Sequence, residues 1–213
     1  MTLHQSFVFA ALVASLATAF AADVTVQVTD MNGQPLKDAV VYVQGESLNQ
    51  ASAPKKADIE QKGKKFNPLV SVVQAGSSVS FPNNDSVRHH VYSFSPIKKF
   101  ELKLYSGVPA NPVVFDKAGT AVLGCNIHDA MLAYVHVVDT AYFAKTDAAG
   151  LATILHVPDG QHQLNVWHYA LKKEHTVYTQ AFTSADAKKP EAPKPEAPKV
   201  VIKLDINPSL LVK

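Results

Sequence analysis

The sequence predicts an all-β fold, in which a Greek-key β-sandwich is joined by a second small β-sandwich formed by the N- and C-terminal segments. Three observations support this prediction. Apolar side chains alternate with polar ones at a period of two over most of the chain. Asn, Asp, Gly and Pro interrupt these runs at short, fairly regular intervals, which is typical of β-sandwiches. The 213 residues, 47% of them hydrophobic, are enough to form a buried core.

The first residues have the features of a secretory signal. Residues Phe7–Phe20 form an apolar run without charges, and the run ends in Ala19-Phe20-Ala21. A short apolar run followed by small residues predicts a signal peptide over 1–21, cleaved after Ala21, and therefore a periplasmic protein. Because no Lys or Arg precedes the run, a buried N-terminal helix is the alternative interpretation.

The mature chain is expected to begin with two strands of the second sandwich. Valines occupy alternate positions of 24–29, the turn at 30–33 follows, and the apolar run 39–43 predicts the next strand. Residues 22–47 are therefore assigned to this sandwich. The segment 48–68 is polar and rich in Ala and Lys, and we expect it to be a long loop.

The remaining strands divide into two groups. Those of the central sandwich, predicted to span 69–138, are expected at 69–73, 77–81, 91–94, 100–105, 113–115, 120–123 and 134–138. The segment 139–213 is expected to return to the second sandwich, with strands at 151–155, 163–167, 176–182 and 200–206. Before the last of these, Lys-Pro-Glu-Ala-Pro occurs twice, which predicts an extended linker over 189–199.

Composition excludes several functional classes. A formal net charge of +2 does not indicate a nucleic-acid-binding protein. The chain has no HExxH motif, no phosphate-binding glycine loop and no Ser/His/Asp nucleophile pattern. One cysteine cannot form an intramolecular disulfide. Because exported proteins meet an oxidising environment, the lone thiol of Cys125 calls for a specific role.

The segment 124–131 contains the residues with the most distinctive chemistry. It places the thiol of Cys125, the imidazole of His128 and the thioether of Met131 three residues apart, between two predicted strands. Sulfur and imidazole ligands suit copper, and two His, one Cys and a weak axial Met make a blue-copper site. The second imidazole must come from an earlier strand, where His89 and His90 are the candidates.

The segment 81–91 resembles the cupredoxin family of type 1 blue-copper proteins. It runs from a Val-x-Phe strand through Asn-x-Asp to a His that is followed at the second position by Val. Because Val91 lies two positions after His89, this pattern selects His89 over His90. The Cys-x-x-His-x-x-Met spacing is similar to the amicyanin/plastocyanin-like branch, and in particular to amicyanins of the methylamine-utilisation type. The resemblance therefore implies one type 1 copper bound by His89, Cys125, His128 and Met131.

The same resemblance implies an electron carrier without enzymatic activity of its own. Its redox partners would be an amine-dehydrogenase-type donor and a c-type cytochrome acceptor, with no role for nucleic acid or for a membrane span. The flanking segments 24–43 and 146–167 resemble a carboxypeptidase-regulatory or transthyretin-like domain, on the strength of an Asp-x-Asn-Gly-x-Pro-Leu run and a Thr-Asp-x-x-Gly turn. That domain would be the second sandwich.

Other interpretations of these residues remain open. Cys125 and Met131 could be core residues, and each histidine could be an ordinary loop residue. His136, on the strand 134–138, is expected to face solvent. The other histidines have no ligand-like spacing: His156, His162, His168 and His175. Two further functions are compatible with the sequence: copper delivery or storage through the same four ligands, and a copper-independent interaction module of the cell envelope.

Overall fold

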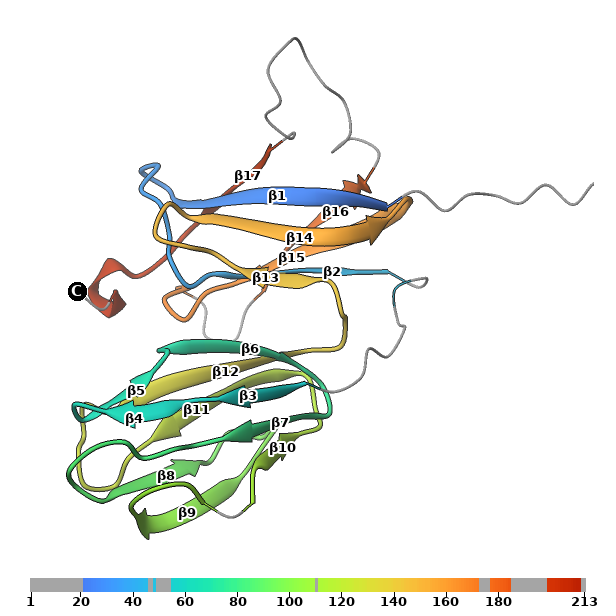
Figure 1. Ribbon diagram of the computed structural model, residues 1–213. Coiled ribbons are helices and arrows are strands. Elements are labelled where there is room, and N and C mark those ends of the chain that lie inside the picture. Colours follow the sequence, from blue (N-terminus) through green and yellow to red (C-terminus); the bar gives the residue numbers. More distant parts are fainter. Residues whose placement is uncertain are drawn as a thin grey trace, which may run out of the picture.

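The protein consists of two β-sandwiches stacked on one another (Figure 1). The computed structural model describes residues 21–45, 48, 55–109, 111–172, 177–184 and 199–211. The predicted signal peptide before residue 21, and all of the predicted linker before Lys199, lie outside the described residues. Within the described part of the chain, no helix is long and apolar enough to cross a membrane.

The terminal sandwich is built from the two ends of the chain. One sheet has the strand order β14-β1-β17, and the other has the order β13-β2-β15-β16. The strand bounds are β1 Ala21–Asp30, β2 Val40–Gln44, β13 Phe143–Lys145, β14 Leu151–Pro158, β15 Gln161–Trp167, β16 Tyr178–Thr183 and β17 Lys199–Leu204. The predicted second sandwich is therefore confirmed, with the central strands inserted between β2 and β13.

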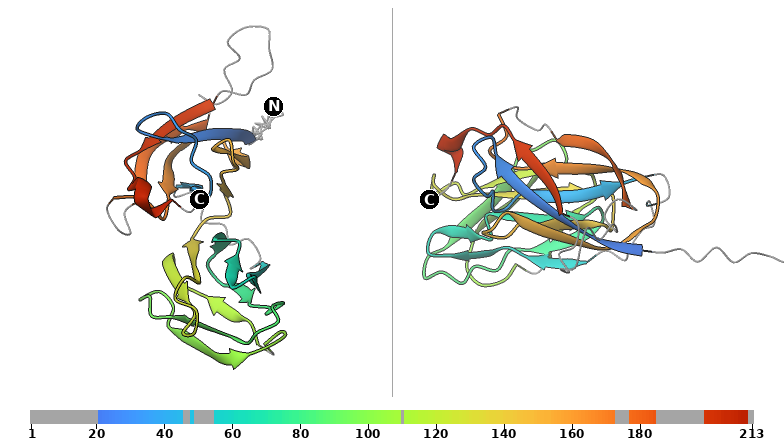
Figure 2. Two further views of the ribbon diagram at one scale, coloured as in Figure 1. Left: turned by 90° about the vertical axis from the view of Figure 1, so that its left-hand side faces the viewer. Right: turned by 90° about the horizontal axis from the view of Figure 1, so that it is seen from above.

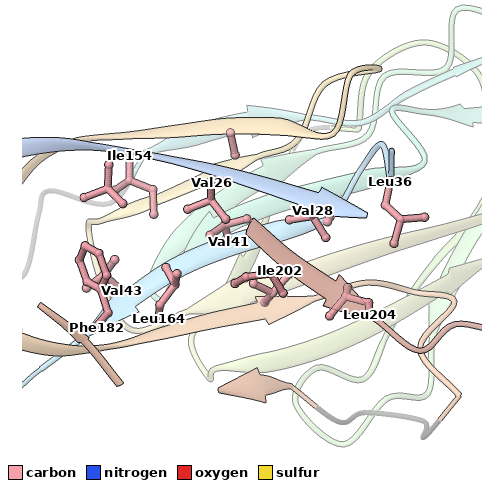
Figure 3. Packing of buried hydrophobic residues seen from close by; sticks show 14 of the residues in the cluster. Val26, Val28, Leu36, Val41, Val43, Ile154, Leu164, Phe182, Ile202 and Leu204 are labelled. Carbon is pink, nitrogen blue, oxygen red and sulfur yellow. The ribbon is translucent and has the colours of Figure 1, made fainter. Parts of the chain in front are cut away.

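Alternating apolar residues form the core of the terminal sandwich. Val26 and Val28 of β1 point toward the opposite sheet (Figure 3), which carries Leu164, and all three side chains are fully buried. The C-terminal strand β17 pairs in parallel with β1, and it contributes Ile202 and Leu204, each 1% exposed. The prediction that the tail docks as a strand is confirmed, because its period of two places these side chains on the core face.

The central sandwich contains the second core. Its larger sheet has the order β6-β12-β11-β8-β9, a three-stranded sheet has the order β10-β7-β3, and β4 and β5 form a separate hairpin. The strand bounds are β3 Lys56–Asp58, β4 Glu60–Lys62, β5 Lys65–Asn67, β6 Val70–Gln74, β7 Ser77–Ser80, β8 His89–Ser93, β9 Phe100–Tyr105, β10 Val113–Phe115, β11 Gly119–Gly124 and β12 Leu132–Val138.

The prediction of a loop over 48–68 was wrong for its second half. The strands β3, β4 and β5 lie there, and Ile59 and Phe66 belong to the central core, so this sandwich begins before residue 69. Strands of three residues are too short to show a clear period of two, and their lysines are all on the exposed side. The turn Gly63-Lys64, with φ angles of 61° and 56°, joins β4 to β5.

The two sandwiches share an apolar interface. The outer face of β2, with Val40 and Tyr42, packs with Val70 of β6, Val138 of β12 and Trp167 of β15. A view turned by 90° also shows β2 on the side of the terminal sandwich next to the central one (Figure 2, left). The second sandwich therefore covers the outer face of β6 and β12, two strands of the sheet that carries the candidate metal ligands.

This interface overturns the prediction that His136 faces solvent. His136 does point away from the central core, where Val135 and Val137 lie, but the terminal sandwich covers that face. Its side chain is therefore buried, and the residue is 3% exposed. The alternation of β12 was correctly predicted, whereas the covering of its outer face depends on strands distant in sequence.

Candidate metal centre

The start of β8 and the loop between β11 and β12 carry the predicted ligands. His89 is the first residue of β8, and Cys125 follows directly on β11. The strand β11 lies between β8 and β12 in the sheet, and Gly124 pairs with Tyr92 of β8. Because β8 and β11 are neighbours, the fold brings His89 and Cys125 together although they are 36 positions apart.

Three of the four predicted ligands form one cluster. Cys125 Sγ lies 4.0 Å from His89 Nδ1 and 3.9 Å from His128 Nδ1. The two imidazole rings are 5.0 Å apart between centroids. The donor atoms of all three residues lie within 4.8 Å of one another. His89 is completely buried and Cys125 is 4% exposed, whereas His128 is partly exposed and forms the edge of the cluster nearest to solvent.

Met131 lies at the end of the same loop. Its backbone N–H donates to the carbonyl oxygen of His128 at 2.9 Å, which closes a turn immediately before β12. The side chain is 2% exposed and belongs to the same buried apolar cluster as Cys125. The thioether of Met131 therefore lies in the core that also contains Cys125, away from bulk solvent.

A carboxylate fixes the ring of His89. Asp85 Oδ2 lies 2.9 Å from His89 Nε2 and accepts the backbone N–H of Lys64 at 2.8 Å. The hydrogen bond from Lys64 and the one from His89 hold the pKa of Asp85 at about 2, below its ordinary value of 3.8. An ionised carboxylate is acceptor-only, so the hydrogen of the imidazole lies on Nε2 and Nδ1 is free to bind a metal.

His90 does not join the cluster. Its Nε2 lies 2.9 Å from Glu101 Oε1, and its ring packs 5.6 Å from that of Tyr92. In the described part of the chain, His89, Cys125 and His128 are the only three His, Cys, Asp or Glu residues that lie close enough to hold a metal together. The cluster contains His89, while the choice of His89 over His90 as a ligand, made from the position of Val91, stays a prediction.

The other described histidines have structural partners. Nε2 of His162 contacts the carbonyl oxygen of Pro158 at 2.8 Å, and Nε2 of His168 contacts that of Lys37 at 3.1 Å. His156 lies on the surface beside Asp23. These contacts are structural for the described histidines, and His175 lies outside the described residues.

Two residues that shape the site were not predicted from the sequence. Asp85 lies four positions before His89, within the Asn-x-Asp segment, and this spacing together with its acceptor chemistry could have marked it. Gly124 precedes Cys125 and lies under the ring of Tyr92, because a Cβ at this position would be 2.7 Å from Cζ and Oη of that ring. Its packing role has no local signal, because the contact is made between strands.

The donor set and spacing suit a soft first-row metal. Bonds of about 2.0–2.3 Å to imidazole nitrogen and thiolate sulfur place neighbouring donor atoms roughly 3.5–4 Å apart. The separations of 3.9 and 4.0 Å between Cys125 Sγ and the two Nδ1 atoms agree with this range. One thiolate, two imidazoles and a nearby thioether are the ligands that favour copper over hard cations such as Mg²⁺.

Comparisons with known proteins find similarity in structure alone. No protein-family model and no curated protein sequence matches the chain. A purple cupredoxin from Nitrosopumilus maritimus is 22% identical, with a TM-score of 0.35, over 38% of this chain and 99% of its own. A reduced Cu(I) form of an amicyanin variant is 20% identical, with a TM-score of 0.35, over 46% of this chain and 98% of its own.

A third structural neighbour is an enzyme. The copper-containing nitrite reductase from Thermus scotoductus is 22% identical, with a TM-score of 0.37, over 42% of this chain and 23% of its own length. All three neighbours are under 25% identical and match less than half of this chain. The chemistry of the site is inferred from the geometry of its own residues.

Proposed function

We propose that this chain is a type 1 copper protein that transfers single electrons between redox partners. The observation that carries the proposal is the buried thiol of Cys125, which has the Nδ1 atoms of His89 and His128 at 4.0 and 3.9 Å. Bound copper would supply a one-electron couple at this position. His89, Cys125 and His128 would hold it, with Met131 as the weak axial ligand.

The surrounding chain supports a carrier more than a catalyst. His89, Cys125 and Met131 are buried at the end of a sheet, so these ligands have little freedom to rearrange between two oxidation states. His128 is the partly exposed ligand, and Ile127 beside it is 50% exposed. If a partner docks over this edge, only the imidazole of His128 would separate it from the bound copper.

Export and the identity of the partners are further parts of the proposal. The apolar run before Ala21 supports secretion to the periplasm. The expected donor and acceptor, an amine-dehydrogenase-type enzyme and a c-type cytochrome, follow from the similarity of the Cys-x-x-His-x-x-Met loop to amicyanin. We propose them as the first pair to test.

Absorption and electron paramagnetic resonance spectra of the copper-loaded protein test the proposal. We expect one bound copper with an intense visible thiolate-to-Cu(II) band and a narrow copper hyperfine splitting. The band should disappear in Cys125→Ser, because a serine hydroxyl is a hard ligand that stays protonated at neutral pH and cannot replace the thiolate. A colourless wild-type protein after copper loading, or a full-strength band in Cys125→Ser, would refute a type 1 centre.

Electron transfer and copper delivery make opposite demands on the same site. A carrier keeps its copper through many cycles of oxidation and reduction, whereas a delivery protein gives its copper to an acceptor. Voltammetry of the loaded protein, followed by incubation with a copper-free acceptor protein, separates the two. Reversible one-electron cycling with the copper retained supports the carrier, and rapid loss of copper to the acceptor favours delivery.

A further inference from the structure

The carboxylate of Asp85 contacts the side of the His89 ring that faces away from Cys125. Nε2 of His89 lies 2.9 Å from Asp85 Oδ2, and Nδ1 lies 4.0 Å from Cys125 Sγ. Because a carboxylate offers only acceptors, Nε2 donates its hydrogen to Asp85. The lone pair of Nδ1 is then directed to the position at which a metal would bind.

Asp85 is itself held in place by the backbone. Its Oδ2 accepts the N–H of Lys64 at 2.8 Å, and its Oδ1 accepts the N–H of Ser86 at 3.1 Å. Its own N–H donates to Asn83 Oδ1 at 3.0 Å, and the Asn83 side chain donates to the carbonyl oxygens of Val87 and Tyr105. These bonds to the backbone and to Asn83 fix the position of the carboxylate.

The bond to Lys64 links two elements. Lys64 lies in the turn between β4 and β5, while His89 begins β8, so Asp85 connects the hairpin to the buried ligand. A ring that is completely buried and bonded at Nε2 cannot turn over without breaking this contact. The orientation of His89 is therefore set by the loop at 83–86 and by the hairpin.

We propose that Asp85 is a positioning residue, which holds His89 in its metal-binding tautomer and orientation before the metal arrives. This inference rests on the proposed copper site and adds a residue that acts through a ligand. Carboxylates that accept from ligating histidines raise the basicity of the ligand, and their loss typically weakens metal binding by about 10–100-fold. We expect a loss in this range when the Asp85 carboxylate is removed.

The chain contains a matched control for this pair. Glu101 Oε1 lies 2.9 Å from His90 Nε2, the same separation as in the Asp85–His89 pair. His90 is adjacent in sequence but does not belong to the cluster. Glu101→Gln therefore removes a carboxylate–imidazole contact of equal length from the neighbouring histidine and leaves the proposed ligand untouched.

Nitrogen-15 spectra of the imidazoles in the copper-free protein test the tautomer directly. At a pH where the imidazoles are neutral, His89 should carry its hydrogen on Nε2 in the wild type and in Glu101→Gln. In Asp85→Ala the two tautomers of His89 should be mixed. A hydrogen on Nδ1 of His89 in the wild type, or a tautomer that Asp85→Ala leaves unchanged, would overturn the proposal.

Copper affinity, measured by competition with a chelator, is the second readout. Asp85→Ala should bind copper about 10–100-fold more weakly than the wild type, and Glu101→Gln should stay within about threefold of it. Asp85→Asn keeps the side-chain volume and should also bind copper more weakly, with unchanged circular dichroism. Equal affinities in Asp85→Ala and Glu101→Gln would contradict the role of Asp85. A wild-type protein that binds no copper would refute the proposed function, and the tautomer measurement would still decide the role of Asp85.

Discussion

His136 of the central sandwich and Trp167 of the terminal sandwich stack on one another across the interface. Their ring centroids are 4.7 Å apart and their planes are inclined by 13°. Nδ1 of His136 lies 2.9 Å from the hydroxyl of Thr120, while Nε2 has no hydrogen-bond partner. The contact therefore favours a neutral imidazole, because a proton on the second nitrogen would be buried without an acceptor.

The pH dependence of stability follows from this contact. Burial lowers the pKa of His136 from 6.5 to about 4. Between these values the unfolded chain binds a proton that the folded chain does not, so the stabilisation is complete above pH 6.5 and is lost as the pH falls toward 4. The loss is on the order of 3 kcal/mol.

Denaturant titrations of the copper-free protein between pH 4 and 7.5 measure this effect. In His136→Phe the stacked ring is kept without a titratable group, so the fall in unfolding free energy over this window should be smaller than in the wild type. Burial also lowers the pKa of His168, which acts with the same sign and remains in both proteins. Identical pH profiles for the two proteins would contradict the assignment to His136.

The alanine variants of His89 and His90 should differ sharply. His89→Ala removes a nitrogen that lies 4.0 Å from Cys125 Sγ, and it should abolish the native copper spectrum. His90→Ala removes the partner of Glu101 and should keep the spectrum of the wild type. Loss of the spectrum in His90→Ala, with retention in His89→Ala, would reverse the ligand assignment.

Met131→Leu should keep the visible colour and raise the reduction potential. The thiolate and both imidazoles are retained, while the loss of a weak axial donor disfavours Cu(II) relative to Cu(I). Leucine has a similar volume, so the buried position of residue 131 should remain filled. Voltammetry of the two proteins gives the comparison, and a potential equal to or below that of the wild type would exclude Met131 as a ligand.

Gly124→Ala should destabilise the protein by about 1–3 kcal/mol, the range for inserting an atom into a packed contact. The new Cβ would lie 2.7 Å from Cζ and Oη of Tyr92, and the ring would have to move. In a Tyr92→Ala background the same substitution should cost almost nothing. Denaturant unfolding measures the loss of unfolding free energy in each variant. If the loss in the double variant equals the sum of the two single losses, the Tyr92 ring is not the cause.

The C-terminal strand offers a matched pair of substitutions. Ile202→Ala removes a side chain that is 1% exposed in the terminal core, and it should cost about 2–5 kcal/mol of unfolding free energy. Val201→Ala changes the neighbouring residue, which is 56% exposed, and should cost less than about 0.5 kcal/mol. Similar losses in both variants would show that the strand does not dock on β1 in solution as described.

The strands, and the residues that the fold brings together in the candidate site, could be predicted because their signals are local. The alternation in β12 and β17 and the spacing of Cys125, His128 and Met131 are each contained in a few residues. The position of His136 could not be predicted in this way, because Trp167 lies 31 positions further along the chain and on a different sandwich. The hairpin β4–β5 was missed because short strands rich in lysine resemble a loop.

The insertion of the central sandwich between β2 and β13 favours one order of folding. In the described part of the chain, the strands β3 to β12 pair only with one another, so the central sandwich can close independently of the terminal strands. The strand β1 pairs with β14 and β17, whose residues lie more than 120 positions later. Contacts of such long range form slowly. The cluster of His89, Cys125 and His128 can therefore form while β1 is still unpaired, and β17 completes the sheet to which β1 belongs.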